Sequence, residues 1–407
     1  MPNRFKALIL SVSLAVVLFM VAGGLVVRAS DNNDGAYRQL GVYSEVLTRI
    51  RSEYVEEPNI PKVTDGALHG LLESLDANSS YLNPDQYKEF KDHKREGKAD
   101  IGAAISKRFG YAAIIAVVPG GPADKAGIEG SDIIESVENR STRDMSLAEI
   151  RDKLSGTPGS NVSLSIVRAR RAEPQKMTLT REVAAYPPVS DKMLEDQIGY
   201  IKADVLNKGK AQEIANRAKA LQRQGAKKLI LDLRDCADGD EAEGMAVANL
   251  FLNHGTIAYL QGQKYPRQTF NADPSRAVTN LPLVVMVNRG TAGPAEIVAG
   301  AIMENGRGDL VGDKTFGVGS VQKLIEIPDG SALILSIAKY YTPSGKAIQD
   351  TAITPNVLVA DADQDAVLPD DDSGTPSTDQ ERKLEKQHED DQLHKAIDVL
   401  KTRQAKS

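Results

Sequence analysis

Apolar residues recur at helical spacing near the start of the chain. The repeat has intervals of one to four residues and consists of Tyr43, Val46, Leu47, Ile50 and Tyr54. A single apolar stripe of this kind is typical of an amphipathic helix. Two more helices are expected, from Val63 to Leu75 and, opened by Pro84, from Asp85 to His93. Residues 31–96 are therefore predicted to form a helical N-terminal region.

Further along the chain the pattern changes to short apolar runs and then to an alternation of runs and helical stripes. Strand-like runs in the next region cover residues 101–105, 112–118 and 162–168. Beyond them, strands are expected at 198–201, 228–233 and 283–287, and helices at 209–224, 242–252 and 295–304. A hairpin is expected from residues 321–327 and 333–339. Alternation of this kind predicts a mixed α/β fold, in which helices cover a sheet.

An uncharged apolar run of 21 residues, Ala7 to Val27, follows Arg4 and Lys6. The run is long enough to span a bilayer. Its positive flank would keep the N-terminus in the cytoplasm and place the rest of the chain outside, in the periplasm. The length favours an uncleaved membrane anchor within residues 1–30. Residues 27–29 also fit a signal-peptide cleavage site, and in that case the mature protein would be secreted or periplasmic.

Composition changes again after residue 360. Residues 361–407 hold 13 Asp or Glu and 7 Lys or Arg, which accounts for the whole formal net charge of −6. Residues 361–379 are rich in Asp, Pro, Ser and Thr and predict a disordered linker. A short helix is expected over 381–401, through Leu384, His388, Leu393, Ile397 and Leu400. The neutral remainder gives no reason to expect nucleic-acid binding.

Cysteine and histidine place few constraints on the chemistry. Cys236 is the only cysteine, so an intramolecular disulfide is impossible. No group of Cys and His residues has the spacing of a zinc site. We therefore expect neither a metal nor a cofactor.

Two segments carry recognisable motifs. Residues 289–297 read RGTAGPAEI, and residues 312–322 read GDKTFGVGSVQ. They resemble the nucleophile and general-base segments of the C-terminal processing (tail-specific) serine peptidases, peptidase family S41, which read roughly G-S-A-S-A-S-E-I and G-x-x-T-F-G-K-G-x-V-Q. Further motifs in the family's order lie at residues 75–82, 231–234 and 340–346. The resemblance implies an S41-type α/β peptidase core over residues 184–360.

Residues 97–183 resemble the PDZ domain of the same family. Residues 119–128 read PGGPADKAGI and match its P-x-x-P-A-x-x-A-G-[IL], and SDII follows at 131–134, with Ser131 in place of a glycine. The resemblance implies capture of a peptide C-terminus by strand addition. The loop expected to hold the free carboxylate consists of Ile101, Gly102, Ala103 and Ala104. A PDZ fold that packs against its neighbour and binds nothing is the alternative.

The resemblance also assigns catalytic positions. In the family pattern a serine attacks the peptide carbonyl, and a lysine kept neutral by burial takes its proton. Gly293 stands at the serine position and Val318 at the lysine position. The 22 positions from Glu296 to Val318 match the pattern without a gap, so a shifted alignment does not restore either residue. Gln322 matches the residue that orients the lysine and is expected to be a structural hydrogen-bonding group.

A third departure lies in the loop after residues 231–234. The family continues with N-x-P-G-G, a glycine pair whose backbone helps to form the oxyanion hole. This chain reads DCADG, so Asp238 replaces the first glycine and Gly239 keeps the second. An aspartate there places a like charge beside the developing oxyanion. No catalytic constellation is therefore expected to be intact.

Two residues could serve as a relocated nucleophile, Thr291 and Cys236. Thr291 and Lys314 lie near the lost positions and could form a shifted nucleophile–base pair. Near-attack geometry tolerates errors of only about an ångström, which weighs against this pair. Cys236 has no histidine placed to activate it and is interpreted as a small, partly buried residue.

The resulting hypothesis is an extracytoplasmic, catalytically inactive homologue, a pseudopeptidase, that binds protein C-termini through its PDZ domain. Its expected partners are the tails of unfolded or envelope proteins, and it could also scaffold an active protease or an adaptor. Residues 7–27 would attach it to the membrane. The alternative is an active serine-type, tail-specific endopeptidase that uses Thr291 and Lys314.

Overall fold

The computed structural model describes residues 34–96, 99–108, 110–168, 173–360 and 391–402. They belong to two compact units, residues 1–68 and 69–407. The apolar run 7–27 and the expected linker 361–379 lie outside the described residues. Within the described ranges, none of the helices combines the length and the apolar character that a bilayer span needs.

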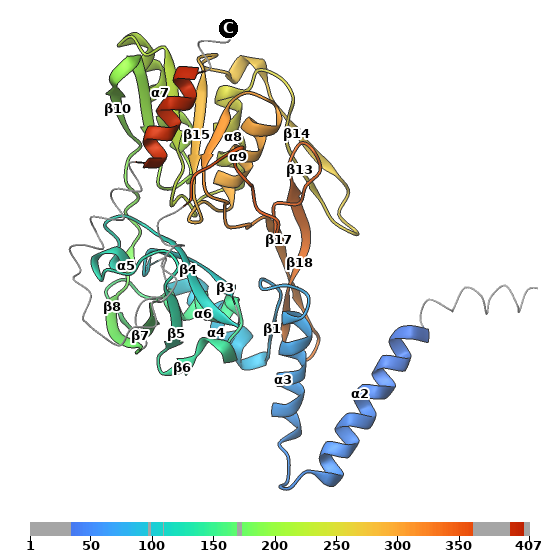
Figure 1. Cartoon of the computed structure of the whole chain (residues 1–407). Helices are drawn as coiled ribbons and strands as arrows, with labels where there is room; N and C mark the ends of the chain where they lie inside the picture. The colour runs from blue at the N-terminus through green and yellow to red at the C-terminus, as the bar shows by residue number, and fades with distance from the viewer. Residues whose placement is uncertain (1–33, 97–98, 109, 169–172, 361–390, 403–407) are drawn as a thin grey trace, which may run out of the picture. The chain divides into compact units, whose positions relative to one another are not determined.

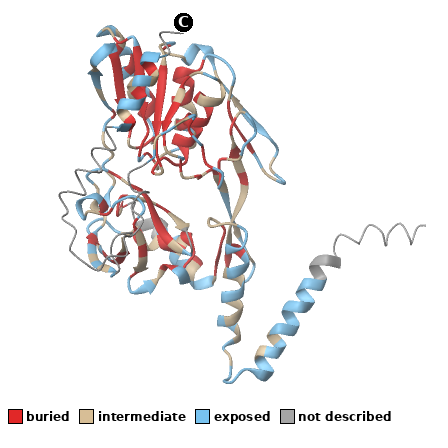
Figure 2. Cartoon of the chain, in the orientation of Figure 1, coloured by how far each residue is buried: buried red, intermediate tan, exposed pale blue. Residues whose placement is uncertain are grey.

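Helices make up the described part of the first unit. α2 (Asp34–Glu53) confirms the first expected helix, and α3 (Ile60–Glu73), which continues into the second unit, confirms the next one. Much of the apolar stripe of α2 is open to solvent, as the exposed fractions of Tyr43 (36%) and Val46 (49%) show. Figure 2 accordingly shows α2 mostly in the colour of exposed residues.

The main sheet of the second unit has six strands in the order β10-β11-β12-β15-β16-β19. Their bounds are Ser190–Leu194, Ile198–Lys202, Lys228–Asp232, Leu283–Val287, Asp309–Gly312 and Val357–Leu358. β10 is an antiparallel edge strand, whereas the other neighbours pair in parallel. Three expected strands, near residues 198, 228 and 283, are thus confirmed.

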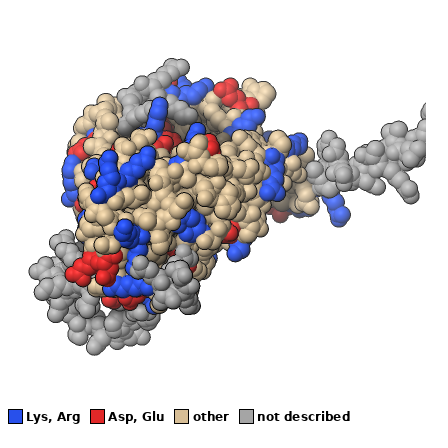
Figure 3. Space-filling view, turned by 90° about the horizontal axis from the view of Figure 1, so that it is seen from above, with Lys and Arg blue, Asp and Glu red and all other residues tan. Residues whose placement is uncertain are grey.

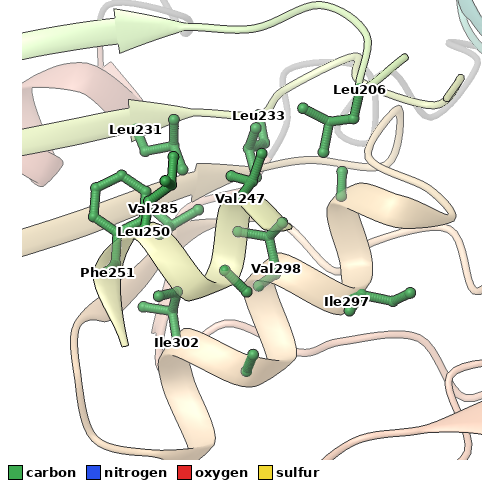
Figure 4. Packing of buried hydrophobic residues seen from close by; sticks show 14 of the residues in the cluster. Leu206, Leu231, Leu233, Val247, Leu250, Phe251, Val285, Ile297, Val298 and Ile302 are labelled. Carbon is green, nitrogen blue, oxygen red and sulfur yellow. The ribbon is translucent and has the colours of Figure 1, made fainter. Parts of the chain in front are cut away.

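Helices α7 (Lys210–Arg223), α8 (Glu241–Phe251) and α9 (Pro294–Glu304) pack on one face of this sheet. Successive strand residues point to opposite faces, so Leu229 and Leu231 face these helices. The close packing of strand and helix residues is visible in Figure 4, which labels Leu231, Val285, Val247, Phe251, Val298 and Ile302. The expected α/β fold is confirmed, and its buried strands stand out in Figure 2.

The opposite face of the sheet is covered by a helix at the end of the chain, residues 391–402, shown in red in Figure 1. Ala396 and Leu400 are completely buried and belong to the same apolar cluster as Tyr200 and Met286. The helix expected over 381–401 is therefore confirmed from residue 391. Its first part, with Leu384 and His388, lies outside the described residues.

A second sheet has the order β3-β4-β5-β7-β8, with β6 paired to β5. The strands are Ala103–Arg108, Tyr111–Val117, Ile133–Val137, Asn161–Val167, Gln175–Thr180 and Arg140–Ser141. Helix α6 (Leu147–Leu154) packs on it. The first strand begins two residues later than expected, because Gly102 forms a left-handed turn with φ 70°. Ser131 also has a positive φ, 75°, which explains why the family favours glycine there.

A third sheet joins β1 to the long hairpin of the core, in the order β1-β18-β13-β14, with β17 on β18. Its strands are Ser80–Leu82, Ala332–Tyr341, Thr256–Gln261, Gln268–Asn271 and Ser320–Glu326. The expected hairpin of β17 and β18 is confirmed, and β17 carries Gln322.

Short elements complete the second unit. They are α4 (Pro84–Glu96), β2 (Ala99–Asp100), α5 (Pro122–Lys125) and β9 (Glu182–Val183). α4 confirms the helix expected after Pro84. Figure 3 shows Lys and Arg interspersed with Asp and Glu among uncharged residues on the face in view.

Candidate active-site cleft

Gly293 forms the turn between β15 and α9, where the family pattern has its serine. Its backbone has φ 58° and ψ −120°. Residues with a side chain adopt such angles only under strain, of about 1–3 kcal/mol. A strained strand-to-helix turn is also how other hydrolases expose a nucleophile. A Cβ placed on Gly293 would meet no atom within 4 Å, so the turn is present with open space in place of a hydroxyl group.

Glu296 holds this turn to the loop before β17. The carboxylate is completely buried and accepts four hydrogen bonds. One oxygen accepts from the Thr315 hydroxyl and, at 2.9 Å, from the Gly317 N–H. The other accepts from the N–H groups of Gly293 at 3.1 Å and Val318 at 2.7 Å. Burial raises the pKa of Glu296 to about 7, against the opposing effect of the four donors.

Glu296 thus also fixes the backbone of Val318, the residue that the family resemblance places at the general-base position, and Val318 lines the cleft. An isopropyl group has no lone pair to accept a proton. Gln322 is exposed, and its amide donates to the hydroxyl groups of Ser320 at 2.8 Å and Ser336 at 3.3 Å. Both serines also bond to the loop before β1, since Ser336 donates to Asp76 at 3.1 Å and Ser320 accepts from Asn78 at 3.1 Å.

Asp238 lies in the loop that the family resemblance assigns to the oxyanion hole. One carboxylate oxygen accepts the N–H of Gly239 at 2.9 Å, and the other accepts the Tyr186 hydroxyl at 3.1 Å. The Gly239 N–H, a candidate oxyanion donor, thus already bonds to a negative charge. Gly239 itself has φ 139°, and a Cβ there would lie 2.3 Å from the Leu206 backbone, so this position requires glycine.

The electrostatics around Tyr186 reflect this aspartate. Burial, followed by the negative charge of Asp238, raises the pKa of the Tyr186 hydroxyl, which therefore stays protonated and donates. Burial likewise raises the pKa of Asp100, and the Asp238 carboxylate adds to the effect. The N–H of Gly102, at 2.7 Å from Asp100, acts in the opposite direction.

The expected carboxylate loop lies in the same cleft. Ile101 and Gly102 are buried, whereas Ala103 and Ala104 are half-buried at the start of β3. The Gly102 N–H donates to the Asp100 side chain and the Ile101 carbonyl accepts from Ala123 at 2.8 Å, so part of the loop's backbone is already bonded.

One cleft of about 400 Å³ joins these parts. From the PDZ-like region it is lined by the carboxylate loop, by Ile105 of β3, and by Arg151 and Leu154 of α6. From the core it is lined by Asp238, Gly239, Gly293, Pro294, Val318 and Gln322. The structure therefore brings together the expected peptide-binding loop and all three positions at which the family pattern is broken.

The candidates for relocated catalytic groups are Thr291, Lys314 and Cys236. The Thr291 hydroxyl is completely buried and donates to the Leu233 carbonyl at 2.8 Å. Lys314 is exposed at the surface. Cys236 is buried, and burial raises the pKa of its thiol well above the usual value, which favours the unreactive protonated form. None of the three lines the 400 Å³ cleft.

Sequence reasoning did not identify Tyr186 or Arg151 as cleft residues. Tyr186 lies in a linker before two prolines, and no motif marks it. It also did not foresee the role of Glu296, because its donors Thr315, Gly317 and Val318 lie 19 to 22 positions further along the chain. In the described part of the chain, no group of three or more His, Cys, Asp or Glu side chains is placed to hold a metal ion.

Comparison with known families agrees with the motifs. Residues 197–359 match the model of peptidase family S41, and residues 114–168 match a PDZ domain model. The fold is similar to that of the photosystem II D1 C-terminal processing protease, with a TM-score of 0.64 and 25% identity over 78% of this chain and 92% of that chain.

Curated relatives cover most of the chain. The carboxy-terminal-processing protease of Bartonella bacilliformis is 30% identical over 84% of this chain and 82% of its own length. The carboxyl-terminal-processing protease of Picosynechococcus is 34% identical over 76% of both chains. CtpA of Bacillus subtilis is 31% identical over 85% of this chain and 74% of its own length. With its S41 core, its PDZ domain and these relatives, the chain belongs to the C-terminal-processing proteases of peptidase family S41.

Proposed function

We propose that this protein is a catalytically inactive member of its family that binds the C-terminal tails of other proteins. The observation that carries the proposal is a cleft that retains its peptide-binding loop and nucleophile turn but offers neither hydroxyl nor amine at Gly293 and Val318. Asp238 adds a carboxylate where a transition state would need donors. Binding and cleavage are separable functions, and the geometry of this cleft supports the first.

The class of ligand follows from the cleft and from the relatives. The relatives are named for the processing of carboxyl termini. Ile101, Ile105 and Leu154 supply apolar walls beside the loop that is expected to hold a carboxylate. We therefore propose tails with an apolar last residue, added as a strand beside β3.

The alternative of a relocated catalytic pair has less support. A nucleophile must reach a substrate carbonyl, and the Thr291 hydroxyl is buried and bonded to a backbone carbonyl. A lysine base needs a lowered pKa, which burial provides, whereas Lys314 is exposed.

A binding titration with the full chain tests tail capture. Short labelled peptides that end in a free Val carboxylate should bind with a measurable Kd, and the same peptides with an amidated C-terminus should bind about tenfold more weakly. Equal affinity for both forms, or no binding of either, would contradict tail capture.

A peptidase assay separates the two functional hypotheses. We expect no cleavage of unfolded proteins with apolar tails and no labelling by a fluorophosphonate probe. Cleavage that disappears in Thr291→Ala or Lys314→Ala would instead support the relocated pair. Cleavage that survives both changes would point to contamination by another protease.

We further propose that the protein acts outside the cytoplasm, attached through residues 7–27. The basis is the length of the apolar run and its positive flank. N-terminal sequencing of the mature protein together with fractionation tests this. A mature chain that begins after residue 29 would show a cleaved signal and contradict the anchor.

A further inference from the structure

The cleft has an unequal balance of charge. Among the described residues that line it, Asp100, Asp238 and Glu241 carry carboxylates, and Arg151 is the only Lys or Arg. Arg151 belongs to the PDZ side and donates to the Ile105 carbonyl at 3.1 Å. With ionised side chains, the lining therefore has a formal charge of −2, although a tail carboxylate must enter it.

Asp238 retains capacity for another partner. A carboxylate has about four acceptor sites on its two oxygens. Asp238 uses one site on each oxygen, for Gly239 and for Tyr186. The side chain is half-buried, so a charge placed beside it inside the cleft is screened less than on an open surface.

The surroundings of Asp238 suit a long side chain with an apolar stem. Gly293, Pro294 and Val318 line the same cleft, and the Gly293 position leaves open space. The loop of Asp238 is bonded to this turn, because the Ala292 N–H donates to the Cys236 carbonyl at 3.0 Å. Lys and Arg combine an apolar stem with a charged end. The stem matches the apolar lining of Pro294 and Val318, and the charged end matches the carboxylate of Asp238.

We propose that Asp238 determines specificity in the bound tail, by selecting a Lys or Arg upstream of the terminal residue. This inference rests on the proposed tail binding and adds the class of peptide to it. The terminal carboxylate lies at the loop Ile101–Ala104, and the chain of the peptide continues towards Gly293. The basic side chain then places its stem against Val318 and its charge beside Asp238.

The test uses the full chain and short labelled peptides with a terminal Val. Lys is placed at each upstream position in turn, and norleucine replaces it in the uncharged control. At one or two adjacent positions, Lys should improve the Kd by about tenfold at low ionic strength. Glu at the same position should weaken binding, and added salt should reduce both effects.

Two variants at Asp238 identify the residue responsible. Asp238→Asn keeps an oxygen for the Gly239 N–H, and Asp238→Gly restores the family residue. In both variants, the ratio of the affinities for the Lys and norleucine peptides should fall to less than about twofold. Asp144→Asn, an exposed aspartate outside the cleft, is the matched control and should leave the preference unchanged.

The outcomes distinguish failure of the charge selection by Asp238 from failure of the proposed tail binding. If the norleucine peptides bind but Lys gives no advantage at any position, the charge selection is wrong and tail capture stands. If the advantage persists in both Asp238 variants, another group selects the charge. If no peptide binds, tail capture fails and the charge selection fails with it.

Discussion

Gly293 has the backbone angles typical of a nucleophile turn, but it has no side chain that could act as the nucleophile. At the residue scale, glycine fits this point without strain, since it has no Cβ to oppose a positive φ. The turn is held by Glu296, whose carboxylate accepts the N–H of Gly293 at 3.1 Å. The residue at the nucleophile position and the residue whose hydrogen bonds shape the turn are thus different.

Gly293→Ala should cost about 1–2 kcal/mol of unfolding free energy, from the backbone angles alone, because no atom lies within 4 Å of the new Cβ. The matched change Gly239→Ala should cost more, about 3 kcal/mol or above, because its Cβ would lie 2.3 Å from the Leu206 backbone. Denaturant unfolding of both variants measures the difference. Equal losses would show that the two loops are not packed as described.

Glu296 should make stability depend on pH. Its pKa is about 7 in the folded protein, above the ordinary value of 4.5, so the folded state binds the proton more tightly. This contribution is fully present below pH 4.5 and is lost as the pH rises through about 7. Between these limits, wild-type stability should fall by about 3 kcal/mol relative to Glu296→Gln, which does not titrate.

The comparison requires unfolding free energies of both proteins across that range of pH. Below pH 4.5, Glu296→Gln should be less stable than wild type by about 2 kcal/mol, since its amide must face at least one backbone N–H donor, that of Gly317 or those of Gly293 and Val318. Parallel pH curves for the two proteins would contradict the raised pKa.

At the scale of elements, the helix of residues 391–402 completes the core from the far end of the sequence. It covers the face of the main sheet that α7, α8 and α9 leave open. Arg234 donates to its Gln392 at 3.2 Å, and Lys401 pairs with Asp196 at 2.8 Å. Its apolar residues supply the main attachment, since these polar contacts are few.

Leu400→Ala should therefore destabilise the protein by about 2–4 kcal/mol, because the side chain is completely buried in the cluster with Tyr200 and Met286. Lys395→Ala, an exposed change on the same helix, should stay within about 0.5 kcal/mol. Thermal or denaturant unfolding tests both. A Leu400→Ala protein as stable as Lys395→Ala would mean that the helix does not pack on the sheet in solution.

The sequence predicts the individual helices and strands better than it predicts the tertiary contacts between them. The strand Leu283–Val287 and the hairpin of β17 and β18 follow from continuous apolar runs and strand patterns. The covering role of the last helix could not be predicted, since its partners in β11 and β15 lie more than 100 positions earlier. The contact of Tyr186 with Asp238 was hidden for the same reason, because it joins two loops without any repeat or motif.

For the whole molecule, the proposed inactivity predicts that a gain of catalysis requires changes in more than one loop. Gly293→Ser with Val318→Lys supplies a hydroxyl and an amine, but Asp238 still opposes the oxyanion. We expect little peptidase activity from this double variant and more when Asp238→Gly is added. Rates of cleavage of an unfolded substrate measure both. Full activity of the double variant would refute the role given to the oxyanion loop.

The helix of residues 391–402 docks on a core to which it is covalently connected, and this connection affects the stability of the protein. Residues 361–390 connect it covalently to the body of the core, so its docking is an intramolecular reaction. A single proteolytic cut between these residues would turn docking into a bimolecular association. On dilution the helix of residues 391–402 would then dissociate from the core. The melting temperature of the core would therefore depend on protein concentration.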